Sequence, residues 1–122
     1  MDSLPLKIAE KFVRRLGRRQ FRLAYLLTQK TWKSRHKARE LRYKRDILFK
    51  LAYAEDPKYI TPAHCTVKIY FTMEYEGHTS GMIVDVHLLR EKGPYQPDEN
   101  GKWGVNPISF LKMFPDGQQR KP

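Results

Sequence analysis

The sequence predicts an α+β domain in which three N-terminal helices pack on a curved, cone-like antiparallel sheet. Two observations lead to this prediction. Residues 1–54 contain apolar side chains at helical spacing, whereas residues 66–91 alternate apolar and polar side chains with a period of two. A chain of 122 residues fits one domain, which we assign to residues 1–114, and we expect residues 115–122 to form a flexible tail.

The first helix is expected over about residues 3–16. Asp2 or Ser3 can cap its start, and Gly17 suits the left-handed residue that follows a helix end. Apolar side chains recur at every fourth position, which is typical of an amphipathic helix with one buried face. This apolar stripe consists of Leu4, Ile8, Phe12 and Leu16.

Two more helices are expected before the sheet. The second, about residues 19–28, is apolar nearly all round and should be buried on more than one side. The third, about residues 35–54, combines an apolar stripe with a basic outer face, and it should end before Pro57, which disfavours the α conformation in the preceding residue. Its inner stripe consists of Leu41, Leu48, Leu51 and Ala52.

The sheet is centred on a hairpin within residues 66–91. We expect its turn at residues 76–81, where two glycines tolerate positive φ angles. Residues 91–101 should form a loop, and residues 102–111 a third strand in which Pro107 requires an edge or a bulge. The residues expected in the core are Phe12, Leu16, Leu27, Leu48, Leu51, Val67, Ile69, Val84, Val86 and Trp103.

The net charge of +11 is unevenly distributed along the chain. Residues 1–50 hold 16 Lys and Arg against 4 Asp and Glu, whereas residues 51–122 hold 8 against 9. Such asymmetry is typical of proteins that meet nucleic acid, an anionic membrane surface or an acidic protein, although a solvated basic helix explains the pattern equally well. The residues expected to bind the anionic partner are Arg14, Arg15, Arg18, Arg35, Lys37, Arg39, Arg42, Lys44 and Arg45.

Four motifs occur in order along the chain. They are Ala9-x-x-Phe12-Val13-x-x-Leu16, Gln20-Phe21-x-x-Ala24-Tyr25-x-Leu27-Thr28, Val86-x-Leu88-x-Arg90-Glu91 and Gly101-Lys102-Trp103-Gly104-Val105. Over roughly residues 4–112 their order resembles the nuclear transport factor 2-like superfamily, whose members share a cone-shaped, cystatin-like α+β fold. Members often have more strands than are visible here, so a short early strand is expected near Trp32 or Tyr59. The helical half is also unusually basic for this family.

The resemblance implies a cone with a pocket between sheet and helices. Some members are isomerases, dehydratases or hydrolases; others bind proteins or serve as assembly domains of type IV secretion and conjugation machines. Three readings therefore stay open, because fold does not define function: a non-enzymatic binding module, a scaffold domain of such a machine, and a ligand binder or enzyme that uses the cone. For the last, Tyr25, Trp32 and Tyr53 are the candidate pocket lining.

Asp85 and His87 share one face of a strand, where a carboxylate beside an imidazole can perform acid–base chemistry. Because Val84, Val86 and Leu88 occupy the opposite face, we expect Asp85 and His87 to point away from the helices. This orientation argues against an enzyme. No catalytic residue is predicted. No phosphate-binding loop or zinc-ligand spacing is visible, so no cofactor or metal is expected.

The outer sheet face carries polar and tyrosine side chains. Members of the superfamily that the chain resembles often pair through this face. The resemblance therefore implies that a homodimer through the outer sheet face is possible. The single cysteine, Cys65, is expected to be a buried strand residue. No apolar run is long enough to span a membrane and the N-terminus lacks a signal-peptide pattern, which favours the cytoplasm if the chain is complete. The compartment is unknown if it is an excised domain.

Overall fold

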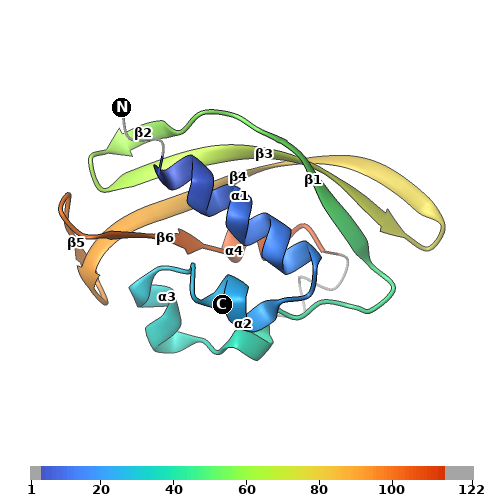
Figure 1. Cartoon of the computed structure of the whole chain (residues 1–122), viewed down its shortest axis with the longest axis horizontal. Helices are drawn as coiled ribbons and strands as arrows, with labels where there is room; N and C mark the ends of the chain where they lie inside the picture. Colours follow the sequence, from blue (N-terminus) through green and yellow to red (C-terminus); the bar gives the residue numbers. More distant parts are fainter. Residues whose placement is uncertain (1–3, 115–122) are drawn as a thin grey trace.

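The computed structural model describes residues 4–114 and confirms the α+β class, with N-terminal helices and a curved, open, six-stranded antiparallel sheet (Figure 1). The predicted tail at residues 115–122 lies outside the described residues. The helices are α1 (Leu4–Gly17), α2 (Phe21–Tyr25), α3 (Lys30–Arg35), the 3₁₀ helix η1 (Ala38–Leu41) and α4 (Ile108–Leu111). The strands are β1 (Leu48–Ala54), β2 (Lys58–Thr61), β3 (His64–Tyr75), β4 (His78–Gly93), β5 (Gln96–Pro97) and β6 (Lys102–Asn106).

The sheet is built on the β3–β4 hairpin, which pairs twelve residues from each strand. Strand β1 lies on the free side of β3, β2 also pairs with β3, and β5 and β6 pair with β4. The turn is shorter than the predicted residues 76–81, because Glu76 and Gly77 form it alone with φ angles of 52° and 78°. A two-residue turn with positive φ at both positions matches strand twist, so the flanking residues continue the ladder.

The predicted third helix over residues 35–54 is wrong. Helix α3 ends at Arg35, η1 follows, residues 42–47 form a connecting segment, and β1 begins at Leu48. Pairing with β3 overrides the helix propensity of this basic stretch, because it satisfies the backbone and turns Phe49 and, in part, Leu51 toward the core. Ile47 and Phe49 are therefore buried, while Leu48 is 57% exposed.

Two other boundaries differ from the prediction. Helix α2 stops at Tyr25, well before residue 28. Strand β6 ends at Asn106, and Pro107 stands at the N-cap of α4, a position where its missing N–H costs nothing. The short early strand expected near Tyr59 is present as β2.

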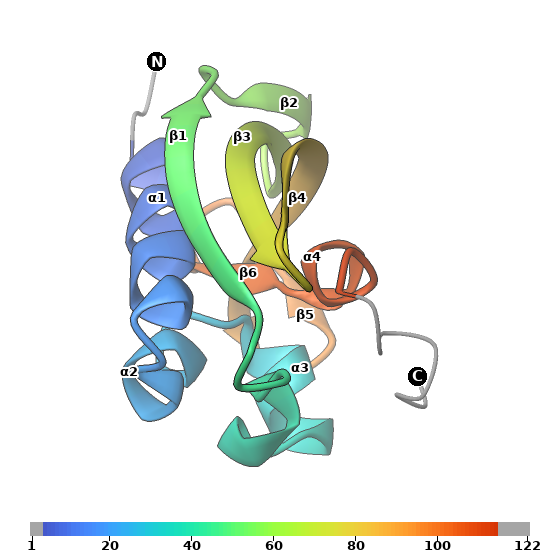
Figure 2. The same cartoon turned by 90° about the vertical axis from the view of Figure 1, so that its right-hand side faces the viewer.

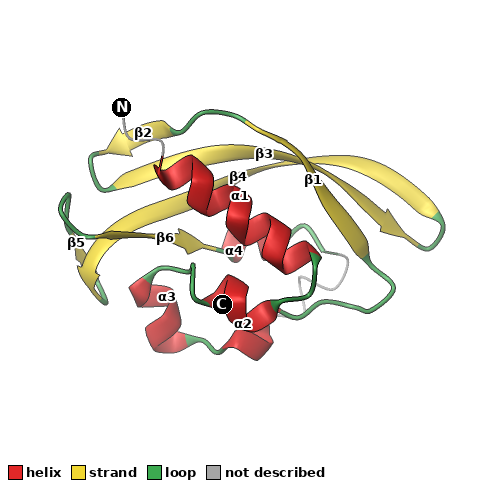
Figure 3. Cartoon of the chain, viewed as in Figure 1, coloured by secondary structure: helices red, strands yellow, loops and turns green. Residues whose placement is uncertain are grey.

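Helix α1 crosses in front of the sheet in Figure 3, and α2 and α3 lie below it. From the edge, Figure 2 shows α1 beside β1, with α2 and α3 gathered at one end of the molecule. Phe110 of α4 lies between the layers, with its ring centroid 5.0 Å from that of Phe71, 5.4 Å from Phe49 and 6.4 Å from Phe12. Aromatic rings therefore fill the interior of the cone.

The expected core is confirmed at seven positions and corrected at three. Leu27 and Leu51 are only partly buried, and Leu48 is exposed because β1 turns it to the outer face. Cys65 is buried in β3 as expected. The confirmed residues are Phe12, Leu16, Val67, Ile69, Val84, Val86 and Trp103.

Candidate anion-binding surface

The exposed side of α1 is basic. Because the buried face of this helix consists of Pro5, Ala9, Phe12, Val13 and Leu16, its cations fall on the opposite side, where they border a shallow groove of about 410 Å³. The predicted stripe is only half buried, since Leu4 is exposed and Ile8 is partly buried. Arg14 and Arg15 lie in the last turn, where positive charge stabilises the helix dipole. Arg14 also lies 3.8 Å from Glu10. The cations at this groove are Lys7, Lys11, Arg14, Arg15 and Arg18.

A second groove, of about 330 Å³, runs between α1 and β1. Arg14 and Arg18 line it together with Lys50, so the two grooves share cations and form one surface. Gly17 makes this close approach possible, because a Cβ there would lie 3.1 Å from the carbonyl oxygen of Phe49. Lys50 thus joins the basic side of α1 only through the tertiary structure.

Arg19 connects α1 to the segment that precedes β1. Its guanidinium donates hydrogen bonds to the carbonyl oxygens of Tyr43 at 3.3 Å, Lys44 at 2.7 Å and Ile47 at 3.0 Å. It also lies 4.3 Å from the centroid of the Tyr43 ring, within cation–π range. Arg19 therefore holds residues 42–47 at the C-terminal end of α1. In the sequence Arg19 is one more positive charge, because its carbonyl partners lie 24 to 28 residues away along the chain.

The other predicted cations do not share one helix, which corrects the expectation for residues 35–54. Arg35 ends α3, and Lys37 and Arg39 lie at η1. Arg42, Lys44 and Arg45 are exposed on the connecting segment. We call the combined set the N-terminal basic surface: Lys7, Lys11, Arg14, Arg15, Arg18, Arg35, Lys37, Arg39, Arg42, Lys44, Arg45 and Lys50.

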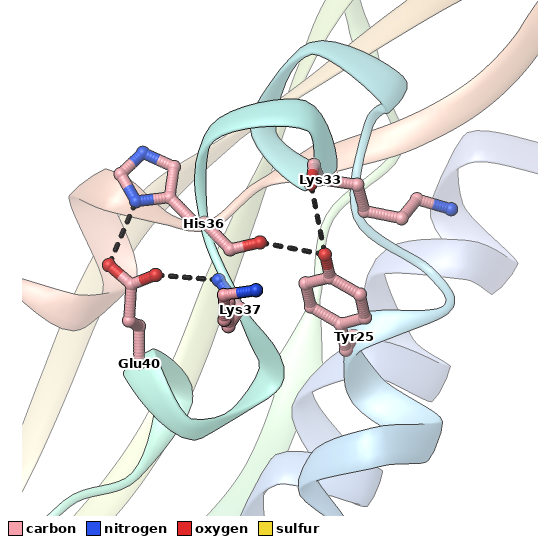
Figure 4. A network of polar contacts seen from close by, with 5 residues as sticks. All are labelled: Tyr25, Lys33, His36, Lys37 and Glu40. Atoms are coloured by element: carbon pink, nitrogen blue, oxygen red, sulfur yellow. Dashed lines mark hydrogen bonds and ion pairs between the residues drawn. The ribbon is translucent and has the colours of Figure 1, made fainter.

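A polar network holds α2, α3 and η1 together (Figure 4). The hydroxyl of Tyr25 lies 3.0 Å from the carbonyl oxygen of Lys33 and 2.7 Å from that of His36. The carboxylate of Glu40 accepts from the backbone N–H of Lys37 and lies 3.0 Å from Nδ1 of His36. Short helices of four to six residues are not stable alone, so these bonds position the cations that the helices carry.

The three candidate pocket residues do not come together. Tyr25 and Trp32 pack between α2 and α3, with ring centroids 5.9 Å apart, and Trp32 stacks on His36. Tyr53 lies elsewhere, because a bulge between Leu51 and Tyr53 shifts the β1 register and turns Tyr53 outward. Its side chain is 60% exposed.

Glu91 is a buried carboxylate that no local sequence pattern marks as a site. It is 2% exposed and accepts hydrogen bonds from the backbone N–H of Thr31 at 3.1 Å and from the Thr31 hydroxyl. The preceding N-cap residue, Gln29, makes no side-chain capping bond. Glu91 therefore caps the N-terminus of α3 from strand β4, which is a structural role.

The outer sheet face carries the polar side chains that the alternation predicted. Asp85 is exposed opposite Lys68 and His87 is half-buried, while Val84 and Val86 are in the core, so both polar residues point away from the helices as expected. The hairpin also brings His64 to His87, with 2.8 Å between Nε2 and Nδ1. Partial burial lowers the pKa of His64, and the neighbouring His87 lowers it further.

Within residues 4–114, no group of three or more histidine, cysteine or acidic side chains is placed to hold a metal ion. Across the same described residues, no helix has the length and apolar character needed to cross a membrane. Comparison of the chain with protein-family models, curated proteins and solved structures gave no match. Membership of the nuclear transport factor 2-like superfamily therefore stays a prediction from the motifs.

Proposed function

We propose that this protein is a non-enzymatic binding module whose N-terminal basic surface binds the phosphate backbone of a nucleic acid. The observation that carries the proposal is the charge balance. The chain holds 24 Lys and Arg against 13 Asp and Glu, and the excess belongs to residues 1–50. Even complete internal pairing leaves eleven cations without an acid, and such an excess favours an anionic partner.

The shape of the surface supports a long polyanion. Helix α1 has 14 residues and is therefore about 21 Å long, and its cations continue onto Lys50 and the segment that Arg19 holds. A DNA duplex carries one charge per roughly 1.7 Å of axis, so several phosphates fall within this length. Contacts to phosphates carry no sequence information, and we expect binding to be insensitive to base sequence.

The interior of the cone supports a binding module over an enzyme. The rings of Phe12, Phe49, Phe71 and Phe110 occupy the space between sheet and helices. Asp85 and His87, the pair suited to acid–base chemistry, lie on the other side of the sheet. The proposal therefore assigns function to the outside of the molecule.

Fluorescence anisotropy at several salt concentrations tests the proposal, with a labelled random duplex and a labelled single strand. Replacing Arg39, Arg42 and Arg45 by glutamine should flatten the dependence of log K on log salt by up to about one phosphate per residue removed. The matched control replaces three lysines of the other half, Lys58, Lys68 and Lys112, and should leave the slope unchanged. Absence of binding at low salt would eliminate the nucleic-acid partner and favour an acidic protein, as in the scaffold reading.

A homodimer is a second proposal, supported by one row of side chains on the outer face. Tyr53 of β1, Tyr70 of β3 and Ile83 of β4 are direct neighbours across three strands. Tyr53 is 60% and Ile83 56% exposed, so the row is an apolar stripe in a polar face. Sedimentation velocity should show a dimer that Ile83→Lys converts to a monomer; a monomeric wild type at high concentration would reject this interface.

A further inference from the structure

An open groove of about 700 Å³ shares no lining residue with the two grooves of the N-terminal basic surface. It is formed where the start of α1, the α2–α3 connection and strands β4 and β6 meet. One side is apolar: Leu4 and Leu26 are 47% and 59% exposed, and Ile8 and Leu27 are partly buried beside them. Each exposed leucine leaves apolar area in water, and a concave wall of this kind is typical of a ligand-binding site.

The rim of this groove carries a cluster of three lysines. Lys30 and Lys102 line the groove, and Lys33 reaches it, since its ammonium donates to the carbonyl oxygen of Leu26 at 3.2 Å. In Figure 4 the side chain of Lys33 runs away from the network of His36 and Glu40. Partial burial lowers the pKa of Lys33, and the charges of Lys102 and Lys30 lower it further, so Lys33 lies close enough to both cations to be repelled by them.

No acid of the described chain neutralises this cluster. Lys30, Lys33 and Lys102 form no ion pair within residues 4–114. Glu91, the acid at the groove, is already bonded to Thr31.

The two other cations at the groove have partners. Lys92 pairs with Asp98 at 3.5 Å, and Arg90 donates to the carbonyl oxygen of Gly101 at 2.9 Å while lying over the Trp103 ring. Lys30 also donates to a carbonyl oxygen, that of Lys92 at 2.7 Å, as Lys33 does to Leu26. An ammonium has three N–H donors, so the three lysines keep both donors and uncompensated charge for an anion.

We propose that this groove binds a monomeric amphiphile with one anionic head and one apolar chain. The lysine cluster receives the head, and the surface of Leu4, Ile8, Leu26 and Leu27 receives the chain. Charge complementarity selects the head, and burial of exposed leucine area supplies affinity. A nucleic acid lacks the apolar chain, and inorganic phosphate lacks it too, so neither satisfies both halves of the site.

Isothermal titration calorimetry with dodecyl phosphate, kept below its critical micelle concentration, tests the proposal. We expect one molecule to bind per chain, and we expect dodecanol and inorganic phosphate each to bind at least about tenfold more weakly. The double substitution Lys33→Gln with Lys102→Gln should weaken dodecyl phosphate binding about tenfold. Leu26→Ser should weaken it about three- to tenfold, and because Leu26 is exposed this variant keeps its core.

The matched control is Lys58→Gln with Lys112→Gln, which removes the same charge from exposed positions outside the groove. Equal weakening by this control would reduce the effect to net charge and overturn the site. Equal affinity for dodecanol, or binding to phosphatidylglycerol vesicles without binding of the monomer, would also overturn it. The Arg39, Arg42 and Arg45 triple variant should bind dodecyl phosphate normally, so this proposal and the nucleic-acid proposal fail separately.

Discussion

The β3–β4 hairpin and the segment from α2 to β1 are built on different principles. The hairpin is long and regular, and its side chains alternate strictly between a core and an outer face. The other segment breaks into four short elements that tertiary contacts hold: the guanidinium of Arg19, the carboxylate of Glu91 and the pairing of β1 with β3. The regular region forms the frame, and the irregular one carries most of the excess positive charge. A surface of like charges therefore depends on a few specific bonds rather than on helix propensity.

The largest effect is expected where the two regions share a core. Phe110→Ala removes the ring that contacts both the sheet and α1, and should lower the free energy of unfolding by about 3–5 kcal/mol. Urea unfolding followed by circular dichroism measures it. A cost below about 1 kcal/mol would mean that the rings do not fill the cone.

Arg19 tests whether the irregular segment depends on single bonds. Arg19→Gln removes up to three charge-assisted hydrogen bonds and should cost about 1–3 kcal/mol. Hydrogen exchange should increase at residues 43–47 and not in the hairpin. Arg22→Gln, an exposed arginine on α2, is the control, and equal exchange in both variants would contradict the assigned role.

Substitutions at Val84 and Leu48 distinguish strand β1 from the third helix that the sequence predicts. Val84→Ala empties a buried position and should cost roughly 1–2 kcal/mol, by analogy with other buried methyl deletions. Leu48→Ala should change stability by less than about 0.5 kcal/mol because this side chain is exposed. A large loss of stability from Leu48→Ala would contradict strand β1 and favour the predicted third helix, in which Leu48 is buried.

The smallest effect concerns pH and the His64–His87 pair. The pKa of His64 in the folded chain is lowered below its ordinary value, so the folded state binds fewer protons than the unfolded state. This group should therefore reduce stability as pH falls from about 7 through the ordinary histidine range near 6.5 and on to the lowered pKa. Urea unfolding at pH 7.5 and 5.5 should show a smaller loss for His64→Gln than for the wild type. An identical loss would place the pH dependence elsewhere.

The sequence alone determined the fold class, the faces of the hairpin and the charge asymmetry. Period-two alternation is local, and a slip of one residue would bury Lys68 or Asp85, so the pattern specifies its own register. Charge is counted from composition and needs no coordinates. The order of helices before strands was likewise sufficient for the α+β class.

Tertiary structure decided the positions that no local pattern encodes. The stretch at residues 42–54 has side chains that suit both a basic helix and a strand, and the free edge of β3 selects the strand. The bulge beyond Leu51 then turns Tyr53 away from the core, and the hairpin register brings His64 to His87, 23 residues apart in sequence. Tertiary structure likewise brings Lys30 and Lys102, which are far apart in the sequence, to line the same groove. Contacts between residues so distant in sequence form only when the whole chain packs. Local periodicity therefore predicted the sheet hairpin but not the arrangement of the charged surfaces.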